Sequence, residues 1–321
     1  MIVFVPIQVG SNIGAVMPSR QRYVFSANGT YYLDIAKSLS LQERRLHRQK
    51  QIFTVFGGYY KDVDGSTVHF NTAPNTWPVK ASIKRGFRMW KKMISQTLKN
   101  TDGMTTGKWN DFKIYLDNQH GNSPILPVDA SGQNLYSSAP EWDYSTLTSA
   151  DTTEAGNGIT MSPDQYELHI VGPHAGATQT EANAAGWTRV GLLESWVNSR
   201  PIQDGSGDPV TVDNGGTTTA VDPLSNLFDV ADVDDDKIMV INDEGDLPPY
   251  DPDDMFGNSA SAGSSNNLQR MSSVQTSSSA PIQTLVGFQA ICGLVQVVVT
   301  GLGSGDTSEL VLDVDTRGVA F

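Results

Sequence analysis

The chain has 321 residues, 38% hydrophobic and 18% charged, so it can bury a large core in one or two folded domains. Its net charge of −13 conceals a split: residues 1–113 hold 17 of the 22 Lys and Arg, whereas residues 114–321 hold 29 of the 35 Asp and Glu. The single cysteine, Cys292, excludes a disulfide within the chain and any zinc site built on cysteines. Because it lies in an apolar run, we expect Cys292 to be a buried, inert thiol.

The first 25 residues are expected to form an arm, because one short apolar run is followed by glycines and scattered polar residues. No basic segment precedes that run, so no secretory signal is predicted, and we expect the product to remain inside the cell. Residues 39–51 favour a helix that starts at Ser38 or Ser40. Its basic face would consist of Arg44, Arg45, Arg48 and Lys50.

Three apolar, strand-like segments follow at 52–56, 59–63 and 67–70. The dipeptide Asp64-Gly65 separates the second from the third and is a strong turn signal. We therefore predict that residues 59–63 and 67–70 pair as a β-hairpin.

Residues 78–98 form the clearest helix pattern in the chain, with apolar residues at spacings of three and four. Pro78 suits the first turn and Thr76 the cap. The other side is basic and consists of Lys80, Lys84, Arg85, Arg88, Lys91 and Lys92. The apolar face, with Phe87 and Trp90, is expected to pack on the barrels of the β-structure, while the cations meet phosphate of a genome or of lipid headgroups. A solvated helix face without a partner is the alternative.

Beyond residue 110, short strand-like segments alternate with loops rich in Ser and Thr. Strands are predicted at 112–116, 166–171, 190–196, 238–241, 285–291, 294–300 and 310–314, and loops at 145–153, 205–219 and 258–279. The mostly apolar segment 281–302 contains three glutamines and a β-branched run, which favours two buried strands over a membrane-spanning helix. The whole pattern predicts an all-β fold, built as one jelly-roll sandwich or as a pair of them.

No catalytic motif is present, so we expect a protein that is not an enzyme. His169 and His174 flank a Gly-Pro corner, but no third ligand accompanies them, and ordinary loop histidines are the preferred interpretation. The acidic run 229–236 contains calcium candidates at Asp234, Asp235 and Asp236. It lacks the glycine and terminal glutamate of an EF-hand loop, and a solvated acidic loop is the alternative. We expect no cofactor other than such a structural calcium ion.

Several short strings are informative together: PNTW at 74–77, GKWNDF at 107–112, EWDY at 141–144, YELHIVG at 166–172, RVGLLE at 189–194 and GDLPPYD at 245–251. This set resembles capsid proteins of small single-stranded DNA viruses, most of all the major capsid protein of the finnlakevirus type, the lipid-containing phage of Flavobacterium. The resemblance spans roughly residues 70–255. It implies a double jelly roll, trimers that form pseudo-hexagonal capsomers over an internal membrane, and no catalytic residues.

On this resemblance we expect an N-terminal arm at 1–25, a first barrel at 26–158 that contains the helix 78–98, and a second barrel at 159–321. The subunit would assemble with itself into an icosahedral virion shell in the host cytoplasm. Its other partners would be minor capsid or vertex proteins and an internal membrane or the genome. The basic N-terminal third would face inward and the acidic loops outward. Alternatively, the two oppositely charged parts neutralise each other across a domain interface.

One departure from the family keeps an alternative fold open. The sequence does not divide into two matching eight-strand sets, so a single jelly roll with long insertions is the alternative fold. Residues 1–19 contain no Lys or Arg, which argues against another group of capsid proteins, whose strongly basic N-terminal arm binds nucleic acid. The same absence suits a shell whose inner face meets lipid headgroups. The alternative function is a carbohydrate-binding or adhesin-like β-sandwich, such as a phage spike or lectin, whose loop residues Trp142, Trp187 and Trp196 would stack on sugars. A jelly-roll hydrolase is the third candidate, although no pair of acids stands out.

Overall fold

A computed structural model of the chain describes residues 18–99, 107, 109–135, 142–149, 164–174, 189–198 and 268–321. Within these ranges the chain is mostly β-structure with three α-helices, which confirms the all-β class. The strands are β1 (Ser19–Phe25), β2 (Gly29–Asp34), β3 (Gln51–Lys61), β4 (Thr67–Thr72), β5 (Pro124–Ile125), β6 (Thr146–Ser149), β7 (Asp164–His169), β8 (Arg189–Gly191), β9 (Gln269–Gln275), β10 (Ile282–Ile291), β11 (Leu294–Thr300), β12 (Ser308–Val314) and β13 (Val319–Ala320). The helices are α1 (Ile35–Glu43), α2 (Trp77–Lys99), α3 (Leu192–Asn198) and the short 3-10 turn η1 (His120–Asn122).

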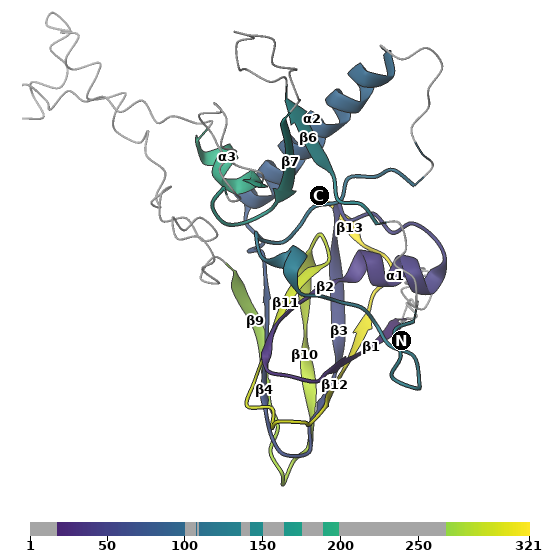
Figure 1. Ribbon diagram of the computed structural model, residues 1–321, viewed down its shortest axis with the longest axis vertical. Coiled ribbons are helices and arrows are strands. Elements are labelled where there is room, and N and C mark those ends of the chain that lie inside the picture. Colours follow the sequence, from purple (N-terminus) through teal and green to yellow (C-terminus); the bar gives the residue numbers. More distant parts are fainter. Residues whose placement is uncertain are drawn as a thin grey trace, which may run out of the picture.

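Two five-stranded sheets enclose the main core (Figure 1). In the first, the order is β1-β12-β3-β10, with β13 also paired to β3; in the second it is β5-β2-β11-β4-β9. All neighbouring strands are antiparallel except β2 and β5. Alternate side chains of both sheets meet in one buried cluster, as Leu310 and Leu312 of β12 and Val295 and Val297 of β11 illustrate. This period of two is the pattern expected of strands with one face on a core.

Strands from the two ends of the chain alternate within both sheets. Residues 19–25, predicted as part of an arm, form β1 and pair along their whole length with β12. β2 pairs with β11, and β3 pairs with β10. The described strands of the two predicted barrels therefore share one sandwich, and residue 158 does not separate them. Residues 1–17 lie outside the described ranges.

The predicted hairpin at 59–70 is wrong. β3 runs unbroken to Lys61 and pairs with β10 and β12, whereas β4 pairs with β9 and β11 in the other sheet. The turn signal itself marks a real turn, since Gly65 has φ of +99°, a conformation that favours glycine. Because this connection changes sheets, the two strands face each other across the core instead of pairing.

Helix α1 begins and ends earlier than the predicted helix 39–51. Asp34 is its cap, because the Asp34 Oδ1 atom accepts a hydrogen bond of 2.9 Å from the backbone N–H of Lys37. The helix ends at Arg44, which adopts a left-handed conformation with φ of 58°. Ser40, a predicted cap, lies inside the helix and donates to the Ala36 carbonyl at 2.7 Å. The basic residues after Glu43 therefore lie beyond the helix.

A second core closes the end of the sandwich where β10 turns into β11. Side chains of α2 and α3, such as Ile83 and Leu192, pack there with Leu168 of β7 and with Cys292 in the turn. We call α2, α3, the three-stranded sheet β6-β7-β8 and residues 109–116 the cap; it occupies the upper part of Figure 1. Cys292 is buried as predicted, and burial raises the pKa of its thiol.

Some local predictions change in and near the cap. The predicted loops 145–153 and 258–279 contain β6 and β9, and the predicted strand 190–196 is mostly α3. Residues 112–116, predicted as a strand, form one isolated bridge, between Tyr115 and His169, and no full strand. The strand predicted at 294–300 is confirmed with the same bounds as β11, and those predicted at 166–171, 285–291 and 310–314 are confirmed with shifted ends. The predicted loop 205–219 and strand 238–241 lie outside the described ranges.

The predicted basic helix is confirmed as α2. The Thr76 carbonyl accepts from the Lys80 N–H at 3.2 Å, so Thr76 occupies the position of the cap residue. In the part of the chain that the structure describes, no helix is long and apolar enough to cross a membrane.

Candidate functional site

Helix α2 concentrates positive charge along one side. Its 23 residues include seven cations and no acid, and it extends about 35 Å, its far end leading away from the sandwich (Figure 1). At 100° per residue all seven cations fall within an arc of about 140°. Of the six predicted site residues, Lys80 is half-buried and the other five are exposed; Lys99 is the seventh cation. The structure therefore brings the predicted residues together on one face.

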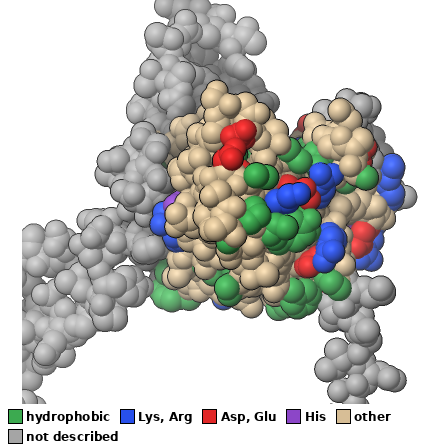
Figure 2. Space-filling model, turned by 90° about the horizontal axis from the view of Figure 1, so that it is seen from below, with side chains coloured by type: hydrophobic (Ala, Val, Ile, Leu, Met, Phe, Trp, Pro, Cys, Tyr) green, Lys and Arg blue, Asp and Glu red, His purple; other side chains and the backbone are tan. Residues whose placement is uncertain are grey.

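The sandwich surface carries a different charge pattern. Figure 2 views the molecule from the end opposite α2, and there basic and acidic side chains lie next to one another. Ion pairs on the outer face of the first sheet join Arg20 to Asp313 at 2.8 Å and Arg22 to Glu309 at 3.0 Å. Across the described ranges, no ion pair joins a lysine of α2 to an acidic side chain. Within the described residues, the excess of positive charge is thus gathered on α2.

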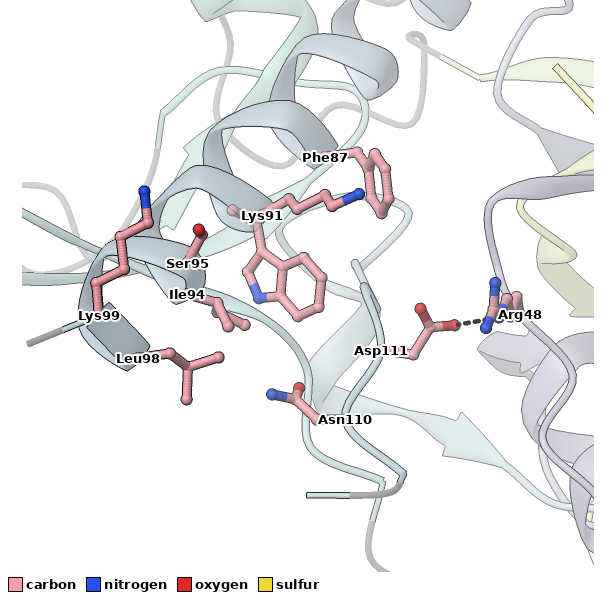
Figure 3. A pocket seen from close by; sticks show the side chains of 10 residues that line it. Arg48, Phe87, Lys91, Ile94, Ser95, Leu98, Lys99, Asn110 and Asp111 are labelled. Atoms are coloured by element: carbon pink, nitrogen blue, oxygen red, sulfur yellow. Dashed lines mark ion pairs between the residues drawn. The ribbon is translucent and has the colours of Figure 1, made fainter. Parts of the chain in front are cut away.

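An open groove with a volume of about 480 Å³ runs along the C-terminal half of this helix (Figure 3). Phe87, Trp90, Ile94 and Leu98 make its apolar floor. Its rim and far wall are polar and consist of Lys91, Ser95, Lys99, Arg48, Asn110 and Asp111. An apolar floor beside lysines suits a ligand that combines apolar and anionic groups.

Aromatic packing holds the floor in place. The rings of Phe87 and Trp90 lie 5.6 and 5.7 Å from the ring of Phe112, and the Lys50 ammonium lies 4.2 Å from the centre of the Phe87 ring. The prediction that these aromatics pack on a barrel is therefore corrected, because they contact the cap segment around Phe112. Beyond this contact, Ile94 and Leu98 remain only half-buried.

The far wall of the groove contains an opposed pair of charges. The Nε atom of Arg48 lies 3.9 Å from Oδ2 of Asp111 (Figure 3). Burial raises the pKa of the Asp111 carboxyl, while a hydrogen bond from the Phe112 backbone and the charges of Arg48 and Lys113 act against this rise. The rim nevertheless has more positive than negative charges, and an anionic ligand is favoured.

A buried polar network joins residues of connecting segments to β2 of the second sheet and offers no open site. Asp34 Oδ2 accepts from Gln49 Nε2 at 2.7 Å and from Trp142 Nε1 at 3.1 Å. The Tyr32 hydroxyl donates to Asp117 Oδ2 at 2.8 Å. Such satisfied networks specify one arrangement of the segments they connect.

Two tryptophans expected to stack on sugars in exposed loops lie elsewhere. Trp142 is half-buried in the network just described, with the Lys113 ammonium 4.8 Å from its ring. Trp196 is 8% exposed and meets Trp77 edge to face at 5.1 Å. The exposed-loop prediction is wrong for both, and Trp187 lies outside the described ranges.

The candidate metal ligands have ordinary roles or lie outside the described residues. His169 is buried, which lowers its pKa to about 4, and its Nε2 atom lies 3.1 Å from the Pro173 carbonyl oxygen. His174 Nδ1 accepts from the Gly191 N–H at 3.1 Å and lies 3.4 Å from Glu194. Among the described residues, no three His, Cys, Asp or Glu side chains are grouped to hold a metal ion. Asp234, Asp235 and Asp236 lie outside these ranges.

Several groove residues were absent from the sequence-based site. Arg48 lies between α1 and β3, and Asn110 and Asp111 follow α2 after a connecting segment, so no local pattern links them to the helix face. Lys99 had a detectable signal, because it lies eight residues after Lys91 and continues the same helix face.

The chain matches no protein-family model, no curated protein and no solved structure. The family suggested by the short sequence strings therefore stays a prediction.

Proposed function

We propose that the chain is a structural coat subunit that assembles with copies of itself into the icosahedral shell of a virion and catalyses no reaction. The observation that carries this proposal is the order of the strands. Successive long strands alternate between the two sheets, with one exception: β4 and β9, separated by a long insertion, pair within one sheet. The first strand, β1, lies beside the last long strand, β12. Eight antiparallel strands in this order are the arrangement of a jelly roll, a fold common in viral capsids.

The same strand order bears on the number of barrels. The described residues contain one such eight-strand set, formed by strands within 19–72 and 269–314, and the cap lies in the insertion between β4 and β9. This favours the single jelly roll with a long insertion over the double jelly roll. A cap projecting from one end of a barrel would give a shell subunit two chemically different ends. We further propose assembly in the host cytoplasm, with vertex or minor capsid proteins as additional partners.

The fold alone does not decide between a coat subunit and a sugar-binding sandwich, since lectins also use jelly rolls. Two observations favour the coat subunit. Trp142 and Trp196 are not exposed for stacking on sugars. The largest accumulation of one charge in the described residues is the cationic face of α2, which suits phosphate in a genome or in the headgroups of an internal membrane.

The test is the assembly state of the purified chain, measured by light scattering and sedimentation across salt and calcium concentrations. The proposal predicts a discrete oligomer, with trimers as the expected unit, that converts to closed particles under some of these conditions. A chain that stays monomeric throughout and binds defined sugars on a glycan array would overturn the proposal in favour of the adhesin-like sandwich.

A charge variant tests the role of α2 within this proposal. Neutralising four of its cations with Lys84→Gln, Arg85→Gln, Arg88→Gln and Lys91→Gln removes about 1 kcal/mol of attraction to an anionic surface per cation, so binding should fall by two to three orders of magnitude, roughly. Binding is measured with phosphatidylserine vesicles and with single-stranded DNA, which separates a lipid from a nucleic-acid partner. Stability should barely change, because the four side chains are exposed.

The matched control makes the same change of charge on the sandwich, with Arg20→Gln, Lys61→Gln, Arg270→Gln and Arg317→Gln. The control should retain most of the binding to vesicles or DNA. Equal losses in the two variants would mean that net charge alone governs binding and that α2 has no special role.

A further inference from the structure

The apolar floor of the α2 groove is about as long as one lipid tail. Phe87 and Trp90 pack on Phe112, and the floor continues along Ile94 and Leu98, which lie next to each other on the helix (Figure 3). From Phe87 to Leu98 the helix is about 16 Å long. The hydrocarbon of one membrane leaflet, which is the reach of one acyl chain, is about 15 Å thick. The floor can therefore accommodate a single acyl chain along its whole length.

A row of hydrogen-bond donors borders this floor. Lys91, Ser95 and Lys99 follow one another at intervals of four residues, so their side chains lie in a line along the helix. All three are exposed, and across the described ranges neither lysine forms an ion pair with an acidic side chain. Two ammonium groups and a hydroxyl beside an apolar floor suit the phosphate oxygens of a phospholipid headgroup.

The acidic group of the groove lining does not cancel this positive charge. Asp111 on the far wall lies beside Arg48, with 3.9 Å between the Nε atom and Oδ2. The lining therefore contains three cations, Arg48, Lys91 and Lys99, against one acid. An anionic headgroup is favoured there over an uncharged one.

The same floor favours a lipid over a nucleic acid. Proteins that bind single strands commonly offer aromatic rings on which successive bases stack. Phe87 and Trp90 are half-buried against Phe112, and the rest of the floor is aliphatic. An aliphatic surface gains from contact with a hydrocarbon chain and offers a base no ring to stack on.

We propose that the α2 groove binds an anionic phospholipid of a membrane. One acyl chain lies along the floor, over Ile94 and Leu98, and the headgroup phosphate lies at Lys91 and Lys99. This inference names the partner of α2 and rests on the anion-binding role proposed for that helix. It does not depend on assembly, because one subunit contains the whole groove.

The experiment changes the floor and leaves the charge of the helix untouched. Ile94→Ser with Leu98→Ser removes the aliphatic part of the floor. Met89→Ser with Met93→Ser is the matched control, on the same helix but outside the groove lining. Binding of the natural chain and of both variants is measured with phosphatidylserine vesicles, phosphatidylcholine vesicles and single-stranded DNA. Thermal unfolding establishes that folded chains are compared.

The natural chain should bind phosphatidylserine vesicles at least about tenfold more tightly than phosphatidylcholine vesicles, because the rim is cationic. The floor variant should bind phosphatidylserine about thirtyfold more weakly, since two half-buried aliphatic side chains no longer gain burial against a lipid chain. The control should change binding by no more than about twofold. Vesicle binding that is equal in the two variants would overturn the proposal. Tighter binding to DNA than to vesicles would also overturn it, by assigning the helix to a nucleic acid.

A second measurement needs no substitution. Soluble alkyl phosphates of increasing chain length are titrated into the natural chain, and the affinity should rise severalfold for every two added methylene groups. An affinity independent of chain length would overturn the proposal, because phosphate alone would then account for binding. Particle formation is measured separately, so a chain that assembles but fails both tests loses the lipid site and keeps the coat-subunit function.

Discussion

His120 should make the folded chain sensitive to mild acid. Its ring is 1% exposed and stacks on Tyr32 at 5.0 Å, and its Nδ1 atom accepts from the Leu116 N–H at 3.0 Å. This hydrogen bond requires a neutral ring. Burial, with a smaller contribution from the charge of Lys37, lowers the pKa of His120 to about 3.

The size of the effect follows from this pKa and from the ordinary value of 6.5. Because the folded pKa is lowered, the unfolded chain takes up the proton first, and stability is lost as the pH falls from 6.5 toward about 3. Each pH unit in this window costs about 1.4 kcal/mol, so the folded chain should lose about 2 kcal/mol through His120 between pH 7.5 and pH 5.

The measurement compares urea unfolding of the natural chain and of His120→Asn at pH 7.5, 6 and 5. The asparagine carbonyl can still accept from the Leu116 N–H but does not titrate. Between pH 7.5 and pH 5, the natural chain should therefore lose about 2 kcal/mol more unfolding free energy than His120→Asn does. For the control His69→Asn, at a half-buried histidine, the difference in unfolding free energy from the natural chain should change far less over the same pH range. A constant difference between the natural chain and His120→Asn would refute the reasoning.

Three further outcomes can be checked. Gly58→Ala would put a Cβ atom 1.9 Å from the Val311 carbonyl oxygen, so it should lower the free energy of unfolding by more than about 3 kcal/mol. Gly305→Ala, with open space around it, should lower the free energy of unfolding by about 1 kcal/mol. Similar losses in the two variants would contradict the close pairing of β3 with β12. Asp34→Ala removes the α1 cap and leaves the buried Gln49 Nε2 and the half-buried Trp142 N–H without their acceptor, so it should lower the unfolding free energy by about 2–4 kcal/mol. An unchanged value would contradict the network. Cys292 should react with a thiol reagent only as fast as the chain unfolds, because its sulfur is buried and burial raises the thiol pKa; rapid labelling of the native chain would contradict its position.

The parts of the fold that depend on local signals could be predicted from the sequence. Helix α2 has a clear apolar period and a proline in its first turn, and its observed bounds differ from the prediction by one residue at each end. The strands β10, β11 and β12 have uncharged or alternating sequences that suit strands and little else, although β10 has one exposed face where a buried strand was predicted.

The errors arise where pairing between distant segments decides the structure. A turn at Asp64-Gly65 is visible in the sequence, but whether the chain returns to the same sheet or crosses to the other depends on partners about 200 residues away or more. The division into two barrels failed for the described strands for the same reason, since β1 finds its partner β12 almost 300 residues later. The apolar run at 190–196 fits a buried strand and a buried helix equally well, and tertiary contacts select the helix α3.

The candidate site could also be predicted only in part, since local signals reveal its helix face but not its groove. The cations of α2 could be predicted because helical geometry alone gathers them on one face. The groove could not, because its far wall comes from Arg48 after α1 and from Asn110 and Asp111 after α2, and only the folded chain brings them together.

The most direct test of the central claim is electron microscopy of the purified chain under assembly conditions, taken to a resolution that separates individual barrels. The account predicts closed particles whose subunits each contribute one barrel, with the cap of every subunit on the same side of the shell. Particles with two barrels in each subunit would contradict the single jelly roll, and the absence of any closed or symmetric assembly would contradict the coat-subunit function itself.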